Sequence, residues 1–345
     1  MTAASPLLAV TMGDPCGIGP EIVARACAST LPAPCVVVGS VDAFRRAVRQ
    51  CSLDLPVLRL DDPEAARDVP RHTVPVWEPP GLPQGLDLPM GTVQAAAGRA
   101  AIVCIEAAAD LALQRRASAV VTAPVHKQAL AAAGSPYPGH TEMLQALVHR
   151  AGPRPEVRMM LANDELRVVL VTIHVALKRA IELLSVERIA TTIRLAHEAG
   201  QRFGIAAPRV AVAGLNPHAG EGGLFGDEEA QLIEPAIAQA RAAGIDARGP
   251  FAPDTVFMRA RHAPGHAGEF DLVVAMLHDH GLIPVKYLGV ERGVNVTLGL
   301  PLVRTSPDHG TAFDIAGRGI ADAASLQAAL SVAHELGRGD LDGRR

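Results

Sequence analysis

The sequence has few aromatic residues, little net charge and no long apolar run. Aromatic residues make up 3% of its 345 residues, too few for a stacking surface for single-stranded nucleic acid. The formal net charge of -4 argues against a broad nucleic-acid-binding face. No apolar run reaches the roughly 18 residues of a membrane span, and residues 1–10 lack the features of a signal peptide. We therefore expect a cytoplasmic protein that binds neither nucleic acid nor membranes.

Cysteine is also scarce, and the five cysteines form no CxxC pair. An odd, unclustered set suits neither a disulfide framework nor a zinc-thiolate site. Because free cysteine is among the most often buried residue types, we expect buried free thiols. The five residues are Cys16, Cys27, Cys35, Cys51 and Cys104.

Hydrophobic residues make up 49% of the chain and charged residues 20%, which is typical of a globular protein. At about 150 residues per domain, the length predicts two domains. Apolar runs alternate with helical stretches, which predicts an α/β fold with a largely parallel sheet. Strands are expected at 7–11, 35–38, 119–122, 167–172, 209–213, 272–276 and 294–298, and helices at 20–28, 93–113, 141–150, 186–203, 227–242 and 321–336.

Two segments depart from this alternation. Residues 157–161 and 167–171 are separated by five residues and predict an antiparallel hairpin inside the sheet. Residues 60–90 hold many of the prolines, and we expect them to form a surface excursion.

Three of the expected strands each lead to a histidine, namely His174, His218 and His278. In open α/β sheets ligands bind at the carboxyl ends of the strands, so these imidazoles are expected to converge. Three neutral imidazoles suit Zn²⁺, Co²⁺, Ni²⁺ or Fe²⁺. The alternative is three hydrogen-bonded histidines at strand ends. His280 is a competing ligand, which we expect on the other side of an extended segment.

Polar residues within apolar sequence indicate an anion-binding site. Thr141 is placed as an N-cap, where free backbone N–H groups bind anions, although an ordinary cap gives the same pattern. Lys286, Asn295 and Arg304 lie in largely apolar sequence, where unpaired polar groups cost free energy. Two cations and an amide suit a phosphate or carboxylate, and surface salt bridges are the alternative.

The glycine-rich segment 13–20 follows the first expected strand, but its spacing matches neither a Rossmann turn nor a P-loop. It either cradles an anion or makes a tight turn. No GxSxG nucleophile elbow is present to indicate a serine hydrolase.

Seven segments, in order along almost the whole chain, resemble the 4-hydroxythreonine-4-phosphate dehydrogenase family of vitamin B6 biosynthesis. They are TMGDPCGIGPEI (11–22), TAPVHK (122–127), GHTE (139–142), GLNPHAGEGG (214–223), APDTVF (252–257), MLHDHG (276–281) and GVNVTLGLPLVRTSPDHGTAFDIAGRG (293–319). The resemblance implies a two-domain α/β/α fold like that of isocitrate and isopropylmalate dehydrogenases, with the active site in the interdomain cleft. It also implies a homodimer with a shared active site.

On this resemblance we place the NAD-side domain at 1–130 plus 300–345. The second domain, with the metal histidines and the dimer interface, is placed at 131–299. The family's metal ligands correspond to His174, His218 and His278. Its substrate-binding residues correspond to His140, Thr141, Lys286, Asn295 and Arg304.

Segment 308–319 resembles the adenine-side NAD loop of the isopropylmalate dehydrogenases. The cofactor-binding residues it implies are His309, Gly310, Thr311, Ala312 and Asp314. The resemblance also implies catalytic roles for Lys286 and Asp254. Two positions depart from the family pattern: His280 stands where Gln is usual, and Cys16 stands where Ala is frequent.

The implied reaction is an NAD- or NADP-dependent oxidation of 4-phosphooxy-L-threonine at its 3-hydroxyl, assisted by Zn, Co or Mg. Decarboxylation to 3-amino-2-oxopropyl phosphate follows, as a step in pyridoxal phosphate biosynthesis. Related dehydrogenases acting on 4-phospho-threonate, 4-phospho-erythronate or an aromatic cis-dihydrodiol are the nearest alternatives. A three-histidine zinc hydrolase and a non-catalytic phosphometabolite sensor are more distant ones.

Overall fold

The computed structural model describes residues 6–149 and 154–341, which divide between two compact units. Unit 1 is Met1–Pro155 with Leu300–Arg338, and unit 2 is Glu156–Gly299 with Gly339–Arg345. The sequence predicts a first boundary near residue 130, whereas 131–155 clusters with unit 1. The reason is that α5 (His140–His149) packs on α3 (Ala95–Leu113), a helix of unit 1. The expectations for residues 1–5 and for a helix end at Arg150 fall outside the described residues.

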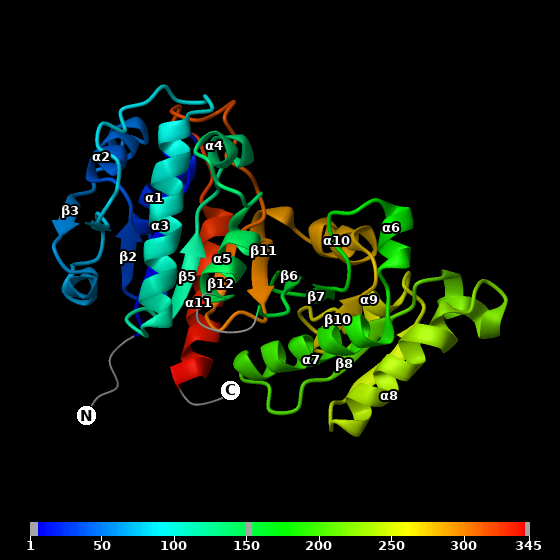
Figure 1. Cartoon of the computed structure of the whole chain (residues 1–345). Helices are drawn as coiled ribbons and strands as arrows, with labels where there is room; N and C mark the ends of the chain where they lie inside the picture. The colour runs from blue at the N-terminus through cyan, green and yellow to red at the C-terminus, as the bar shows by residue number, and fades with distance from the viewer. Residues whose placement is uncertain (1–5, 150–153, 342–345) are drawn as a thin grey trace. The chain divides into compact units, whose positions relative to one another are not determined.

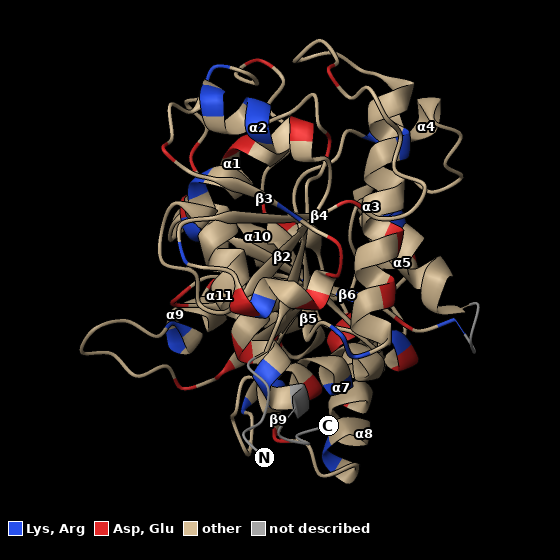
Figure 2. Ribbon diagram, turned by 90° about the vertical axis from the view of Figure 1, so that its left-hand side faces the viewer, with Lys and Arg blue, Asp and Glu red and all other residues tan. Residues whose placement is uncertain are grey.

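The strands of unit 1 lie in the order β3-β4-β2-β1-β5-β12, and neighbouring strands pair in parallel. Its strands are β1 (Leu8–Thr11), β2 (Cys35–Val38), β3 (Val57–Leu60), β4 (Val74–Trp77), β5 (Ala119–Thr122) and β12 (Arg304–Pro307). Every residue of strands β1, β2 and β5 is buried, so their sequences are almost entirely apolar. Charged residues lie on the helices and loops around them (Figure 2).

The helices of this unit cover the sheet, and Figure 1 shows α3 lying along the strands. The others are α1 (Gly19–Cys27), α2 (Val41–Gln50), α4 (Lys127–Ala132), α5, and α11 (Ala324–Leu341), most of which belongs to unit 1. The expected surface excursion over 60–90 is wrong in part, because β4 lies within it and pairs with β2 and β3. Short strands that carry proline, such as β4 with Pro75, lack the long apolar run that identifies a strand.

The sheet of unit 2 is mixed and runs in the order β11-β6-β7-β10-β8-β9. Its strands are β6 (Arg158–Ala162), β7 (Arg167–Leu170), β8 (Val210–Ala213), β9 (Ala247–Phe251), β10 (Leu272–Ala275) and β11 (Val294–Leu298). The predicted hairpin is confirmed, because β6 and β7 pair antiparallel with Met160 opposite Val169. Strands β7, β10, β8 and β9 pair in parallel.

Alternate residues of these strands pack on opposite faces of the sheet. Val168, Ala211 and Val273 form a core with α9 (Val256–Ala260) and α10 (His278–Tyr287). The helices α7 (Val186–Arg202) and α8 (Glu234–Ala242) contact β8, β9 and β10. Each large apolar side chain buried in this way contributes about 1.5–3 kcal/mol. The predicted α/β fold in two parts is confirmed.

All five cysteines are buried and free, as predicted. Burial raises the pKa of Cys16 to about 11 and the pKa of Cys27 to about 12, and it raises the pKa of Cys104 further. These thiols are therefore protonated at neutral pH and unreactive in the folded protein. Across 6–149 and 154–341, the structure has no helix with the length and apolar character that a bilayer requires.

Candidate active site

Three neighbouring parallel strands of unit 2 lead to the three predicted metal histidines. Strands β7, β10 and β8 lie side by side in that order, and the chain beyond them reaches His174, His278 and His218, respectively. Parallel strands emerge at a common edge and lie about 4.8 Å apart. The ends of β7 and β8, with β10 between them, are thus about 10 Å apart, and His278 stands at the middle strand.

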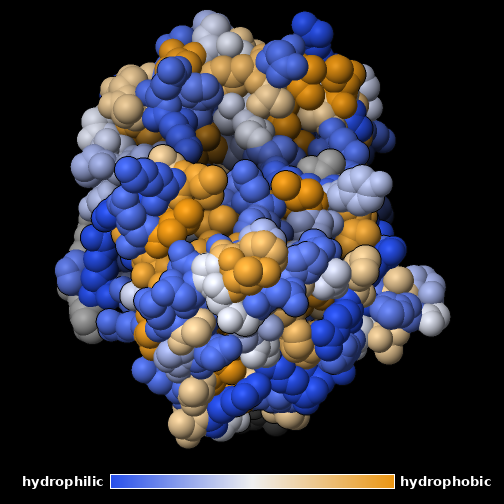
Figure 3. Space-filling view, turned by 90° about the vertical axis from the view of Figure 1, so that its right-hand side faces the viewer, coloured by the Kyte–Doolittle hydropathy of each residue, from blue (hydrophilic) through white to orange (hydrophobic). Residues whose placement is uncertain are grey.

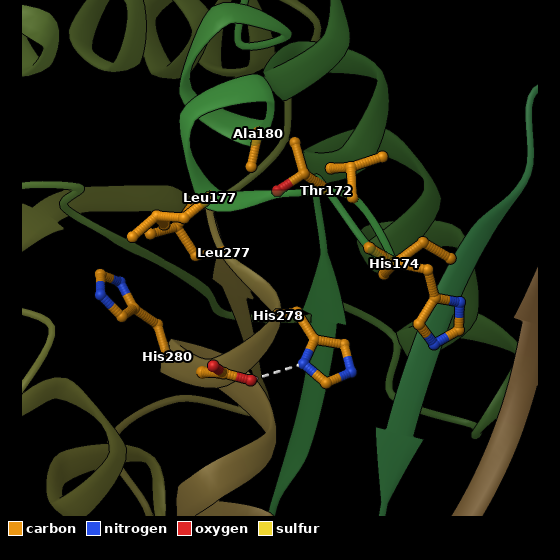
Figure 4. Close-up of a pocket in the computed structure, with 10 residues that line it drawn as sticks. Thr172, His174, Leu177, Ala180, Leu277, His278 and His280 are labelled. Carbon is orange, nitrogen blue, oxygen red and sulfur yellow. Dashed lines mark hydrogen bonds and ion pairs between the residues drawn. The ribbon is translucent and has the colours of Figure 1, made fainter.

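His174 and His278 form a pair. Their ring centroids are 5.5 Å apart, and both rings line a pocket of about 350 Å³ in unit 2 (Figure 4). Oδ1 of Asp279 lies 2.7 Å from Nδ1 of His278, which leaves Nε2 of that ring for a ligand. His174 has φ +49°, a left-handed conformation that side chains with a Cβ rarely adopt and that clusters at functional sites.

His280 also lines this pocket, but its ring lies apart from the pair. It follows His278 by two residues on α10, a rotation of about 200° around the helix. Figure 4 shows its ring pointing to the opposite side from His278. The expected position on the other side is found, but the segment is helical and not extended as predicted.

His218 does not join the pair within one chain. Its loop is left-handed over 218–222, with φ +53° at His218 itself, and its ring lies 6.2 Å from that of Phe225. In the described ranges 6–149 and 154–341, no three or more His, Cys, Asp or Glu side chains group closely enough to hold a metal ion. The convergence of all three histidines on one ion therefore stays a prediction.

Glu229 holds the loop that carries His218. Its Oε1 accepts hydrogen bonds from the backbone N–H groups of Leu215 and Asn216, both at 2.8 Å, and its Oε2 accepts one from Nδ2 of Asn216. Burial raises the pKa of Glu229, but these hydrogen bonds outweigh it and leave the pKa below its ordinary value. Glu229 begins a π-helical turn, Glu229–Ile233, a feature frequent at functional sites. In the sequence this residue stands out only as an acidic residue early in an expected helix.

The other predicted residues of unit 2 lie on separate elements. Lys286 is exposed near the end of α10, about 12 Å along the helix axis from His278. Asn295 is half-buried on β11, opposite Leu161 of β6. Asp254 is exposed just before α9.

Unit 1 holds a buried cation at Arg304, which is 4% exposed. Its Nε and Nη2 donate hydrogen bonds to Oγ1 of Thr122, at 3.1 and 2.7 Å. Burial lowers the pKa of Arg304 to about 10, against the opposing effect of Glu142, so the guanidinium is still charged at neutral pH.

His140 accompanies this cation. Burial and the nearby charge of Arg304 hold the pKa of His140 well below its ordinary value, so the imidazole is neutral. Its buried Nε2 has no hydrogen-bond partner in the described part of the chain. Helix α5 begins at His140, which places Thr141 in the first turn rather than at the predicted N-cap. The first turn of a helix presents free backbone N–H groups, so this cluster suits an anion.

The predicted cofactor loop, 308–319, lies against the glycine-rich turn. The carbonyl oxygen of Thr311 accepts a hydrogen bond of 3.1 Å from Ile18, and a Cβ on Gly17 would approach that oxygen to 2.9 Å. His309 and Asp314 are exposed, and a Cβ on Gly310 would meet open space. The loop thus presents an imidazole and a carboxylate to solvent.

Several known proteins with similar sequences are named as dehydrogenases. Residues 31–333 match the family model described as pyridoxal phosphate biosynthetic protein PdxA. The 4-hydroxythreonine-4-phosphate dehydrogenase of Beijerinckia indica is 52% identical over 95% of this chain and 94% of that protein. The D-threonate 4-phosphate dehydrogenase of Salmonella typhimurium is 44% identical over 95% of this chain and 98% of its own. The crystal structure of 4-hydroxythreonine-4-phosphate dehydrogenase from Klebsiella pneumoniae superposes with a TM-score of 0.87, at 43% identity, over 98% of this chain and 99% of that one.

Thr122→Val tests the anchoring of Arg304. We expect the free energy of unfolding to fall by about 1–3 kcal/mol, because a buried guanidinium loses its hydroxyl acceptor while the side-chain shape is kept. Urea denaturation followed by circular dichroism measures this difference. Thr92→Val makes the same chemical change at an exposed position and is expected to stay within about 0.5 kcal/mol of the parent. Equal effects of the two substitutions would contradict the assignment.

Proposed function

The chain belongs to the PdxA family of pyridoxal phosphate biosynthetic proteins, and we propose that it oxidises 4-phosphooxy-L-threonine at the 3-hydroxyl with NAD or NADP. A bound nicotinamide would supply the hydride acceptor, and the oxidised substrate would be a β-keto acid. Loss of CO₂ from that acid gives 3-amino-2-oxopropyl phosphate. The observation that carries this proposal is the cluster of buried Arg304 and neutral His140 at the start of α5, which suits a phosphate ester.

In unit 1 the phosphate is bound by charge and by hydrogen bonds. The guanidinium of Arg304 is fixed by Thr122 and supplies the positive charge. The unpartnered Nε2 of His140 and the backbone N–H groups around Thr141 donate to phosphate oxygens. These groups are preorganised, so little ordering is required when the substrate binds.

A divalent ion, Zn, Co or Mg, is assigned to the histidines of unit 2. Bonds of about 2.1 Å from two ring nitrogens to one ion are compatible with the 5.5 Å between the rings of His174 and His278. His218 lies outside the pair, so we assign the third position to His218 of a second copy of the chain. Lewis-acid stabilisation of a developing alkoxide is the chemistry that such an ion supplies when bound.

The chain's own residues complete the reaction. Lys286 and Asp254 are exposed on unit 2 and are the two candidates for accepting the proton of the 3-hydroxyl. Asn295 is assigned to hold the substrate by its amide. The cofactor is assigned to the exposed loop with His309 and Asp314.

The second candidate is oxidation of 4-phospho-threonate, which the name of the Salmonella relative favours. It shares the phosphate, so Arg304 and His140 serve both candidates. Arg304 and His140 disfavour a cis-dihydrodiol, because that substrate has no phosphate to pair with the guanidinium or to accept a hydrogen bond from the imidazole.

The absorbance of NADH during turnover decides among these substrates. With a divalent ion present, we expect kcat/KM for 4-phosphooxy-L-threonine to exceed the values for 4-phospho-threonate and a cis-dihydrodiol by about tenfold or more, which corresponds to about 1.4 kcal/mol. The product is checked as 3-amino-2-oxopropyl phosphate by mass spectrometry. A higher kcat/KM with the threonate would reassign the substrate. Formation of neither NADH nor NADPH from any of the three substrates would overturn the proposed dehydrogenase activity.

Alanine substitution of His174, His218 or His278 tests the metal assignment. Each change removes one proposed ligand, so we expect kcat/KM to fall by about 100-fold or more and the bound metal to be lost, while the melting temperature stays close to that of the parent. Metal content is measured by mass spectrometry after dialysis. His266→Ala, an exposed histidine of the same unit, is the control and retains both metal and activity. Near-normal activity in the His218 variant would exclude its metal role.

Apolar side chains on unit 2 support association of two copies. Leu177 on α6 (Leu177–Glu182) and Ile283 on α10 are each 65% exposed, and Tyr287 on α10 is 90% exposed. Figure 3 shows hydrophobic residues grouped on the face that it presents. Exposed apolar groups of this kind mark interaction surfaces, so we assign the dimer contact to unit 2.

Ile283→Glu tests that contact. A charge at a buried interface position is unfavourable, so we expect the mass in solution to fall from dimer to monomer, as measured by light scattering during size-exclusion chromatography. Leu58→Glu makes a comparable change at an exposed leucine of unit 1 and is expected to leave the dimer intact. A dimer that persists in the Ile283 variant would place the contact elsewhere.

A further inference from the structure

Unit 1 contains a second group of polar side chains, which the reaction described above does not use. It lies where three segments of that unit meet: the turn after β1, the segment after β5 and the loop 308–314. The backbone N–H of Asp14 donates to the carbonyl oxygen of Pro124 at 2.9 Å, and that of Ile18 donates to Thr311 at 3.1 Å. These hydrogen bonds join residues that are far apart in the sequence into one local structure.

Asp14 is buried without enough hydrogen-bond donors. It is 1% exposed, its Oδ1 accepts from the backbone N–H of Cys16 at 2.9 Å, and the backbone of His126 also hydrogen bonds to its carboxyl group. Its Oδ2 is buried and, among the described residues, has no partner. Burial raises the pKa of Asp14 above its ordinary value, which reflects the cost of this arrangement. Buried carboxylate oxygens are normally satisfied, so a missing donor indicates a ligand.

His126 presents a second unsatisfied atom beside this carboxyl group. Its Nδ1 is buried and, within the described part of the chain, has no hydrogen-bond partner. Its ring stacks on Phe313, with centroids 4.6 Å apart and an interplanar angle of 19°. Phe313 stands between Ala312 and Asp314, two residues assigned to the cofactor. The stacking therefore holds the imidazole at the cofactor loop in one orientation.

The turn that carries Asp14 is itself held rigidly. Nη2 of Arg46 donates to the carbonyl oxygen of Pro15 at 2.8 Å, and Gly91 donates to the carbonyl oxygen of Cys16 at 2.8 Å. Because the turn is rigid, the carboxyl group of Asp14 loses little conformational entropy when a ligand donates a hydrogen bond to it. This favours binding at Asp14.

We propose that Asp14 and His126 form a subsite for a hydrogen-bond-donating group of the pyridine dinucleotide, either a ribose hydroxyl or the nicotinamide carboxamide. The inference rests on the proposed function, because it requires the dinucleotide at the loop 308–314. It adds to that site two residues that precede the loop by more than 180 positions in the chain. The ligand's O–H or N–H donates to Oδ2 of Asp14, and Nδ1 of His126 makes the neighbouring hydrogen bond.

Asp14→Asn and His126→Phe test the subsite. The amide has the shape of the carboxylate without its charge, and the phenyl ring keeps the stacking on Phe313 without the ring nitrogens. We expect each variant to raise the Kd for NADH, measured by fluorescence, by about tenfold or more. The KM for 4-phosphooxy-L-threonine is expected to change less than about twofold. Asp110→Asn, at an exposed position of α3, is the matched control.

A second ligand distinguishes the two donor groups. ADP-ribose contains both ribose rings and lacks nicotinamide. A loss of affinity that persists with ADP-ribose assigns the donor to a ribose hydroxyl, and a loss seen only with the complete dinucleotide assigns it to the carboxamide.

Failure of the subsite and failure of the proposed function give different results. If the parent protein binds NADH and both variants bind it within about twofold of the parent, the subsite is overturned and the dehydrogenase stands. If the parent protein itself does not bind NADH or NADPH, the proposed function is overturned and the subsite with it. Melting temperatures show whether Asp14→Asn is folded, and His126→Phe keeps the test valid if it is not.

Discussion

The parallel pairing of β7, β10 and β8 determines where the functional side chains of unit 2 lie. Three segments of the chain leave the sheet at the same edge, and each leads to a histidine. A slip of one residue in the register would turn Val168 and Val273 away from the core they share with α10, so the register is strongly fixed. Beyond the strands, left-handed backbone at His174 and His218 sets the direction of each loop. The buried carboxylate of Glu229 compensates for the strain in the second of them.

The same kind of constraint acts in unit 1. Arg304 stands opposite Val120 in the parallel ladder of β12 and β5, and Thr122 follows two residues further along β5 on the same face. The register therefore brings a hydroxyl to the guanidinium. Burial of His140 and the nearby charge of Arg304 both lower the pKa of that imidazole. Burial and this neighbouring charge together keep the imidazole neutral, and the charged guanidinium favours an anionic ligand.

Much of this arrangement is predictable from the sequence, because buried parallel strands read as apolar runs. The ends of β7, β8 and β10 identify the three histidines without any structure, and the hairpin of β6 and β7 follows from its spacing. The sequence does not predict strand β4, because the strand has only four residues and Pro75 interrupts its apolar pattern. The separation of His218 from the pair depends on left-handed residues and on Glu229, neither of which has a local sequence pattern. The proposed cofactor loop is predicted from family resemblance alone. Its contact with the glycine-rich turn joins residues far apart in the sequence, so no local pattern predicts it.

Unit 1 buries two ionisable side chains of opposite kind, the carboxyl group of Asp14 and the guanidinium of Arg304. In the sheet order β1, β5, β12, the carboxyl group of Asp14 follows β1, and the guanidinium of Arg304 begins β12. A phosphate ester is attracted by Arg304 and repelled by Asp14, whereas a neutral hydroxyl or amide donor is satisfied by Asp14 and gains little from Arg304. In the proposed assignment, Arg304 therefore favours the phosphate of the substrate, and Asp14 favours an uncharged donor group of the dinucleotide. Both groups are nearly inaccessible to solvent, so this discrimination is weakly screened by salt.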